Sequence, residues 1–266
     1  MAVELTREEF AIAEGFFNKT MFQIPALAVI NSRFPGKVFV DNKENPRAAL
    51  VWALSRWSYL SCMEFLPRHI SFIIEVLNTM IFPILGEVGE SDFEVYCDNN
   101  AIRDSVLNEA LKDFKVNNHH ENTFILNRER FEKLDFEQKL TSDMEICECT
   151  LPIVPEVYHK YYPYEKFGRK VFGMAVTKNG ELISQCMNNG FAHGNRYFID
   201  LDTFSNSERN KGYGTLISYH LIINQLKKGL LPLWETTVDN MPSQKVAYKL
   251  GFEKAEEYTV YTITKF

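Results

Sequence analysis

The sequence predicts a mixed α/β protein (α+β, with a mixed sheet) made of two halves, and three observations favour this fold class. Apolar runs of strand length alternate with runs of helical spacing along the whole chain. Asn179-Gly180 joins two apolar runs and is a strong β-hairpin signal. Residues 198–222 begin as an apolar strand, pass through a polar loop with two glycines and end as an apolar helix.

The elements expected in the first half follow from these patterns. Residues 1–30 indicate helix and loop, and residues 38–53 a hairpin whose turn contains Asn42 and Pro46. A long apolar helix is expected at 68–82, a strand at 92–97, a helix at 101–114 and a strand at 121–127. His119-His120 is assigned to a polar loop.

The second half is expected to begin with a strand near Met144, so the predicted domains are 1–141 and 142–266. A helical or irregular segment is followed by the hairpin at 170–186 and a strand at 196–203. The remaining elements are a buried helix at 214–228, a strand at 230–238, a short helix ending at Gly251 and a final strand.

The two halves share an order of elements, which predicts a degenerate internal repeat. Each has a hairpin (38–53 and 170–186), then a strand (92–97 and 196–203), then a helix (101–114 and 214–228). The junction after Cys97 has no glycine, whereas the second junction has Gly212 and Gly214. Chemistry that needs these glycines is therefore expected only in the second half.

Composition restricts the class of protein and its partners. The chain has 266 residues and a formal net charge of -6, without an Arg- or Lys-rich tract, so we expect no nucleic-acid partner. The N-terminus is not a signal peptide, and the apolar run at 70–85 is interrupted by Glu75, Asn78 and Pro83. We therefore expect a cytoplasmic protein without a membrane partner.

The five cysteines form no recognisable framework. Their odd number and scattered positions argue against a set of disulfides, and Cys147-Glu-Cys149 lacks the CxxC spacing of zinc and redox sites. Reduced thiols and no bound metal are expected.

The glycine loop has the composition of a phosphate site. A helix N-terminus presents unpaired N–H groups and a partial positive charge, which favour anions. Glycine permits positive φ and close approach of a ligand. Arg209 and Lys211 add formal charge. The alternative interpretation is a tight turn without a ligand.

Three phosphate-binding motifs compete for this loop. A Walker loop fails because no Lys follows Gly214. A dinucleotide fingerprint fits Gly212 and Gly214, with Glu235 at a ribose position, but has Ile217 where the third glycine belongs. The motif Arg/Gln-x-x-Gly-x-Gly/Ala matches in full.

On these residues the chain resembles the GNAT superfamily of N-acetyltransferases, whose motif wraps the pyrophosphate of acetyl-CoA. Asn240, Ser243 and the sequence Leu250-Gly251-Phe252 are similar to the second cofactor segment of the family. The resemblance covers residues 144–266 and implies a GNAT fold with a splayed mixed sheet there, with a degenerate GNAT-like half before it. The stretch "PLWETTVDNMPS" and the extra half resemble the subgroup of the zwittermicin A resistance acetyltransferase.

The resemblance implies roles for residues of the loop and its neighbours. Backbone groups at the strand end would hold the pantetheine arm, the glycine loop would hold the pyrophosphate, and two residues would contact the pantetheine side. These are, in that order, Leu201, Asp202 and Thr203; Arg209, Asn210, Lys211, Gly212, Tyr213, Gly214 and Thr215; and Asn240 and Ser243. For the last two, capping of the helix that follows is the alternative role.

The resemblance also implies catalytic groups. Asp200, on the strand before the loop, is the candidate general base. Many family members use a tyrosine acid where this chain has Ala247; Tyr248 is rotated about 100° around the helix. The acid is therefore Ser243, water or absent.

The function implied is N-acetylation of a small-molecule primary amine with acetyl-CoA as co-substrate and without a metal. The alternatives are a non-catalytic acyl-CoA-binding module, a protein N-acetyltransferase and a dinucleotide enzyme. A homodimer is left open as the assembly.

Overall fold

The computed structural model describes residues 1–98, 101–134, 140–163 and 170–264. These residues form two compact units. Unit 1 comprises Met1–Glu121, Pro155–Glu165 and Glu257–Phe266, and unit 2 comprises Asn122–Val154 and Lys166–Glu256. Unit 1 thus includes two segments from the second half of the sequence, and unit 2 begins before residue 142. The domain boundary predicted at residue 141 remains a prediction.

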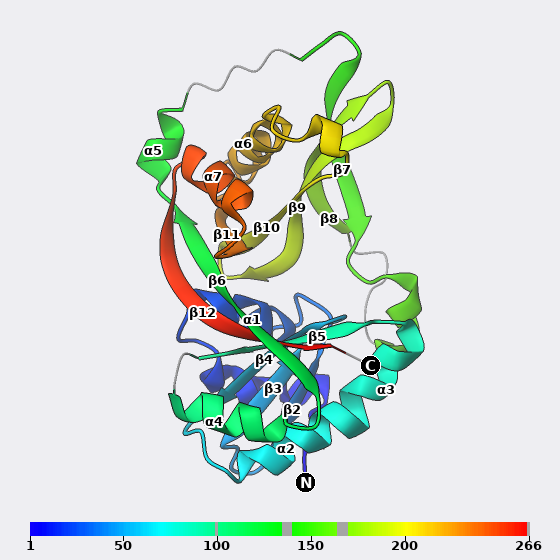
Figure 1. The fold of residues 1–266 in the computed structure, drawn as a ribbon, viewed down its shortest axis with the longest axis vertical. Helices are drawn as coiled ribbons and strands as arrows, with labels where there is room; N and C mark the ends of the chain where they lie inside the picture. The colour runs from blue at the N-terminus through cyan, green and yellow to red at the C-terminus, as the bar shows by residue number, and fades with distance from the viewer. Residues whose placement is uncertain (99–100, 135–139, 164–169, 265–266) are drawn as a thin grey trace. The chain divides into compact units, whose positions relative to one another are not determined.

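Unit 1 contains a mixed sheet in the order β1-β2-β3-β4-β5-β12 (Figure 1). Neighbours are antiparallel except β4 and β5, which are parallel. The strands are β1 (Val3–Glu4), β2 (Lys37–Val40), β3 (Ala48–Trp52), β4 (Trp57–Cys62), β5 (Asp92–Cys97) and the C-terminal part of β12 (Phe252–Thr264). The helices are α1 (Ile24–Ile30), α2 (His69–Glu75), α3 (Phe82–Val88), α4 (Ala101–Ala110) and the 3-10 helices Arg7–Phe16, Met21–Gln23 and Glu156–Tyr161.

The apolar helix between β4 and β5 runs from His69 to Val88 and contains a π-helical turn at Val76–Ile81. This wide turn lies just before Pro83, which lacks the N–H of a regular helical bond. By length and composition alone the helix could cross a membrane, but core helices of soluble proteins pass the same test. Phe72, Ile73 and Val76 on it are buried. The absence of a membrane partner remains a prediction.

Unit 2 repeats the strand pattern of unit 1, in the order β7-β8-β9-β10-β11-β6 (Figure 1). The first four strands are successively antiparallel, and β10 and β11 are parallel. The strands are β7 (Met144–Pro152), β8 (Lys170–Lys178), β9 (Glu181–His193), β10 (Arg196–Thr203), β11 (Leu231–Thr237) and the end of β6 (Lys115–Leu126). The helices are α5 (Arg128–Glu132), α6 (Tyr213–Leu226), α7 (Met241–Lys249) and the 3-10 turn Asn206–Glu208.

The predicted hairpin and the buried helix are confirmed. Asn179 and Gly180 have φ of 51° and 82°, as a two-residue hairpin turn requires. Ile217, Leu221 and Ile222 of α6 belong to the core cluster of unit 2. All five cysteines are free thiols.

The repeat is present, but the predicted correspondence of its parts is wrong. The prediction missed β4 and paired β5 with β10. The strand pairing instead equates β4 with β10, the helix 69–88 with α6, β5 with β11 and α4 with α7. The junction equivalent to the glycine loop is therefore 63–68, which also lacks glycine.

The polar loop predicted at His119-His120 is also wrong, because both residues lie in β6. His119 Nε2 is 3.1 Å from Glu121 Oε1, and His120 Nδ1 is 3.4 Å from Thr259 Oγ1 of β12. The polar composition of this segment indicated a loop. In the structure these polar side chains lie on a strand, because polar side chains of β6 and β12 are their partners.

Candidate active site

The parallel strands of unit 2 separate at their carboxyl ends. Pairing of β10 with β11 runs from Arg196/Leu231 to Ile199/Trp234. The strand β10 continues to Thr203, and there it pairs only with β9, from Asp200/Met187 to Thr203/Ser184, within residues that the structure describes. One edge of β10 is therefore turned toward an opening between the two strands.

The alternation of the backbone determines which groups of β10 face this opening. Asp202 O accepts a hydrogen bond from Ser184 Oγ (2.7 Å), and Phe204 N donates to Ile183 O (3.0 Å), both on β9. Because successive residues of a strand point their N–H and C=O groups to opposite sides, those of Leu201 and Thr203 point away from β9. They are suitably placed to pair with an extended amide-bearing ligand.

The loop after β10 places the N-terminus of α6 beside this edge. Asn210 and Gly212 adopt φ of 61° and 88°, and Gly212 is the N-cap of α6. The first helical bond is from Leu216 N to Gly212 O (3.0 Å), so the N–H groups of the first turn have no acceptor within the helix. Of the two glycines of the motif, only Gly212 has the positive φ that favours glycine.

Gly214 favours close packing instead. It lies in the first turn of α6, and a Cβ added there would come within 3.2 Å of Leu201 Cδ2. Leu201 would have to shift by a few tenths of an ångström to accept that Cβ, so the glycine favours the observed approach of the helix to the end of β10.

The cations of the loop are largely engaged by the protein itself. Arg209 Nε donates to Thr203 O (3.2 Å), which ties the end of the loop to the end of β10. Lys211 Nζ lies 2.9 Å from Glu208 Oε2, and Lys178 Nζ lies 3.5 Å from Glu208 Oε1. The hydrogen bond from Lys211 holds the pKa of Glu208 below its usual value. Lys211 therefore stabilises the loop.

The opposite wall is the helix α7. Asn240 is its N-cap, and its Oδ1 accepts a hydrogen bond from Ser243 N (3.2 Å). Ser243 Oγ in turn accepts from Trp234 Nε1 (2.9 Å). Asn240 therefore caps α7, which is the alternative role given above. Because Ser243 Oγ is the acceptor in its bond with Trp234, the hydroxyl proton of Ser243 remains able to donate.

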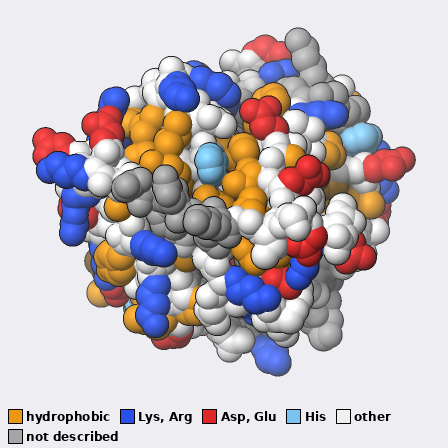
Figure 2. All heavy atoms as spheres, turned by 90° about the horizontal axis from the view of Figure 1, so that it is seen from above, with side chains coloured by type: hydrophobic (Ala, Val, Ile, Leu, Met, Phe, Trp, Pro, Cys, Tyr) orange, Lys and Arg blue, Asp and Glu red, His pale blue; other side chains and the backbone are white. Residues whose placement is uncertain are grey.

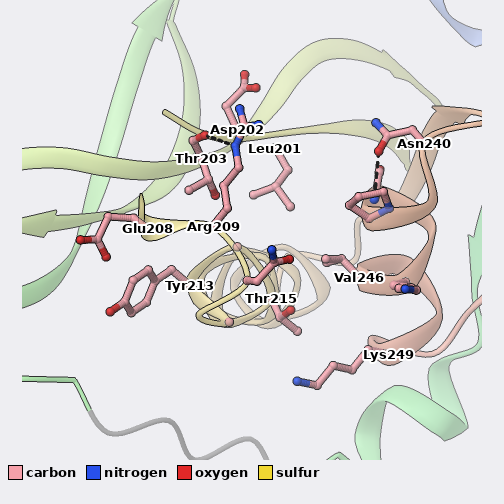
Figure 3. A pocket seen from close by; sticks show the side chains of 16 residues that line it. Leu201, Asp202, Thr203, Glu208, Arg209, Tyr213, Thr215, Asn240, Val246 and Lys249 are labelled. Carbon is pink, nitrogen blue, oxygen red and sulfur yellow. Dashed lines mark hydrogen bonds between the residues drawn. The ribbon is translucent and has the colours of Figure 1, made fainter. Parts of the chain in front are cut away.

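These elements enclose a cavity of about 690 Å³ (Figure 3). Most of the predicted cofactor residues line it: Leu201, Asp202, Thr203, Arg209, Asn210, Gly212, Tyr213, Gly214, Thr215, Asn240 and Ser243. Asp200 and Lys211 are not among its lining residues. Sequence reasoning missed Glu208, Pro242, Lys245, Val246 and Lys249, of which the last four recur at helical spacing.

Comparison with known proteins identifies the family. A family model described as GNAT acetyltransferase matches residues 15–261, which include most of both units. The chain belongs to the GNAT acetyltransferase family.

Relatives of this GNAT acetyltransferase align over nearly its whole length. It is 23% identical over 263 residues to an uncharacterized N-acetyltransferase, YdfB, of Bacillus subtilis, with 97% of each chain covered. A GCN5-related N-acetyltransferase-like protein from Streptococcus suis superposes with a TM-score of 0.64 at 15% identity, covering 96% of this chain and 98% of the other. A tandem GNAT protein from the clavulanic acid biosynthesis pathway gives 0.58 at 12% identity, covering 98% and 97%.

Acid and base candidates of the GNAT site are few. Ala247 is fully buried, and Tyr248 packs edge-on against Phe124 with ring centroids 5.4 Å apart. Neither is among the lining residues of the cavity, so neither takes the place of the tyrosine acid of the family. Ser243 and Tyr213 supply hydroxyl groups on the cavity wall. Asp200 is exposed on the same side of β10 as Asp202.

The equivalent place in unit 1 is built differently among the residues that the structure describes. There β4 and β5 stay paired up to Leu60/Cys97, the last residue of β5. Arg103, only 1% exposed, donates to Cys97 O (3.4 Å) and to Asp98 O, so its guanidinium group lies at the end of β5. Among the described residues, the separated strand ends and the glycine loop that suit the GNAT cofactor are therefore found in unit 2 alone.

Charged groups are mixed on the surface. On the face shown in Figure 2, Lys and Arg side chains alternate with Asp and Glu among hydrophobic patches, and no large area of one charge is seen among its described residues. This agrees with the modest net charge of -6.

Proposed function

We propose that this acetyltransferase transfers the acetyl group of acetyl-CoA to a primary amine of a small molecule by direct attack on the thioester. The observation that carries the proposal is the opening between β10 and β11 beside the uncapped first turn of α6. The chemical class of the amine rests on the sequence resemblance to the zwittermicin A resistance subgroup, which we retain as part of the proposal.

The binding roles follow from the geometry. Acetyl-CoA supplies the activated acyl group. The backbone of Leu201 and the N–H of Thr203 would pair with its pantetheine arm, as an added strand pairs with a free sheet edge. The first-turn N–H groups of α6 and the backbone of Asn210 would hold the pyrophosphate. Asn240 and Ser243 face the same cavity from α7.

The transfer needs a neutral amine and a protonated leaving group. Asp200, directly or through water, would accept the proton of the amine as its nitrogen bonds to the acyl carbon. A strand N–H would stabilise the oxyanion, and the C–S bond then breaks. Ser243, whose Oγ is held by Trp234, would return a proton to the departing thiolate.

Binding of one acetyl-CoA per chain is the first expected result. Unit 2 offers a cavity, whereas in unit 1 the Arg103 guanidinium group lies at the end of β5. Calorimetric titration should give a stoichiometry of one for acetyl-CoA and no heat with NAD. A stoichiometry of two would contradict the assignment to unit 2, and NAD binding in place of acetyl-CoA would favour a dinucleotide enzyme.

A second candidate function is a non-catalytic acyl-CoA-binding module, which is favoured by Ala247 at the position of the tyrosine acid. A measurement of turnover distinguishes it from an enzyme. With an amine panel, thiol release should be measurable for the wild type. Asp200→Asn should lower kcat about 100-fold and remove the acidic limb of the pH–rate profile, as loss of a general base does. Asp143→Asn, an exposed carboxyl outside the cavity, is the matched control and should change neither.

Three other outcomes would change the proposal. Unchanged kcat in Asp200→Asn would remove this residue from the mechanism. Acetylation of peptides but of no small amine would favour a protein N-acetyltransferase. Binding of acetyl-CoA without any turnover would favour the non-catalytic acyl-CoA-binding module.

A further inference from the structure

Three sulfur-bearing side chains lie on one face of the sheet of unit 2, where β8 lies between β7 and β9 (Figure 1). Cys149 of β7 pairs with Gly173 of β8, and Gly173 pairs with Met187 of β9, so these residues form one row across the strands. Cys147 is two residues before Cys149 and therefore points to the same face. We call Cys147, Cys149 and Met187 the sulfur cluster.

The sulfur cluster is on the face of the sheet opposite α6. Met174 and Val176 of β8 belong to the core cluster together with Ile217 and Leu221 of α6. Because Gly173 alternates with Met174 along β8, its row faces the other way. The three residues of the sulfur cluster are not among the lining residues of the cavity. A ligand of the sulfur cluster would therefore bind apart from acetyl-CoA.

Contacts hold two of the three sulfur atoms together. The Cys149 thiol donates to Met187 Sδ at 3.4 Å, and Gln185 Nε2 donates to Cys149 Sγ at 3.4 Å. Met187 Sδ lies where a Cβ of residue 173 would be, so the glycine leaves room for the thioether to reach β7. Burial raises the pKa of the Cys147 thiol, and the nearby Cys149 thiol adds to this effect. Met187 is buried, whereas both thiols are partly exposed.

The donor set is soft. Thiolate and thioether sulfurs are the ligands that select Cu(I), whereas zinc takes Cys, His and carboxylate ligands. No group of three His, Cys, Asp or Glu side chains in the part of the chain that the structure describes could hold a metal ion. The N–H of Gln185 would stabilise a thiolate at Cys149. Two thiolates and one thioether therefore favour Cu(I).

A disulfide between Cys147 and Cys149 is the competing chemistry. Residues two apart on a strand have Cα atoms about 6.6–6.8 Å apart, at the upper end of the usual disulfide range of about 4.4–6.8 Å. Both cysteines are free thiols. A disulfide would also leave the contact with Met187 without a role, whereas coordination of a metal ion uses all three sulfur atoms.

We propose that Cys147, Cys149 and Met187 form a binding site for Cu(I). The cation takes the place of the two thiol protons, which pass to solvent, and no electron is transferred. This site departs from the expectation that no metal is bound. That expectation rested on the CxC spacing, which does not reveal Met187, 38 residues from Cys149 in the chain.

The test follows Cu(I) binding to the reduced protein without oxygen, in competition with bicinchoninate, a chelator that is coloured when it holds Cu(I). The ligand variants are Cys147→Ser/Cys149→Ser and Met187→Leu, which nearly conserves side-chain volume. The matched control is Met174→Leu, because Met174 is a buried methionine of the adjacent strand on the opposite face. Circular dichroism verifies that each variant is folded.

The wild type should retain one Cu(I) per chain, with the ultraviolet absorption of Cu(I)–thiolate bonds, and the double cysteine variant should retain none. Met187→Leu should weaken binding at least about tenfold, since even changes outside a ligand set cost that much. Met174→Leu should bind like the wild type.

Three results would overturn the proposal. In the first, either ligand variant binds Cu(I) as tightly as the wild type. In the second, the wild type loses two thiols in air and binds no Cu(I), which would favour a disulfide. In the third, the wild type retains Zn(II) in preference to Cu(I). None of these results bears on acetyl-CoA binding, so the proposed function is tested separately.

Discussion

Residues 142–256 produced alone will not form a stable unit 2. This segment lacks Phe124 of β6 and Phe131 of α5, which are 0% and 2% exposed in the core of the unit. Phe131 packs against Tyr219 of α6 with ring centroids 5.1 Å apart, and Tyr219 OH donates to Leu134 O (3.3 Å). Truncation of one buried Phe costs about 3–5 kcal/mol. Two such losses approach the total stability of about 5–15 kcal/mol of a domain.

The matched segment is 122–256, which restores the end of β6 and the whole of α5. It should melt cooperatively by circular dichroism, whereas 142–256 should show no cooperative transition. The difference also includes the hydrogen bonds from Asn127 N to Gly251 O (3.0 Å) and from Asn127 Nδ2 to Glu253 Oε1 (2.9 Å). Equal melting of both segments would show that β6 and α5 are dispensable for unit 2.

Gly212→Val will abolish measurable acetyl-CoA binding, with a loss of at least about 100-fold. The φ of 88° at Gly212 sets the direction of the first turn of α6, and a β-branched residue disfavours this conformation most. The resulting shift would move the N–H groups that we assign to the pyrophosphate. Isothermal titration with acetyl-CoA measures the loss.

Gly229→Val is the control for this experiment. Gly229, at the other end of α6, has a φ of 77° and nothing within 4 Å of an added Cβ. Both variants should be destabilised by a similar ~1–2 kcal/mol of left-handed strain, but only Gly212→Val should lose binding. If Gly212→Val bound acetyl-CoA like the wild type while equally folded, the glycine loop would be a turn without a ligand.

Local patterns predicted the regular elements well where one feature dominated. The strand at 196–203 and the hairpin turn at Asn179-Gly180 were predicted with their observed boundaries. The strand β4 was missed because nearly all of its residues are buried, which hides the alternation of one face. Its preceding turn has positive φ at Leu54 and Ser55, so no glycine marks it.

The candidate site was predictable where the backbone itself forms it. Gly212 and Asn240 occupy helix N-caps whose residue types indicate their positions. The positions of long charged side chains could not be read from spacing, since Lys211 pairs with Glu208 and does not line the cavity, whereas Lys249 does line it. The roles assigned to the individual site residues, and the domain boundary near residue 141, remain predictions.

The exchange of β6 and β12 between the units has a consequence for synthesis on the ribosome. Tyr96 of β5 pairs with Val260 of β12, about 160 residues later in the chain. At a translation rate of roughly 5–20 residues per second, β5 is without this pairing partner for on the order of 10–30 s. Unit 1 is therefore encoded first but completed last. During that interval the unpaired edge of β5 is open to pairing with strands of other chains.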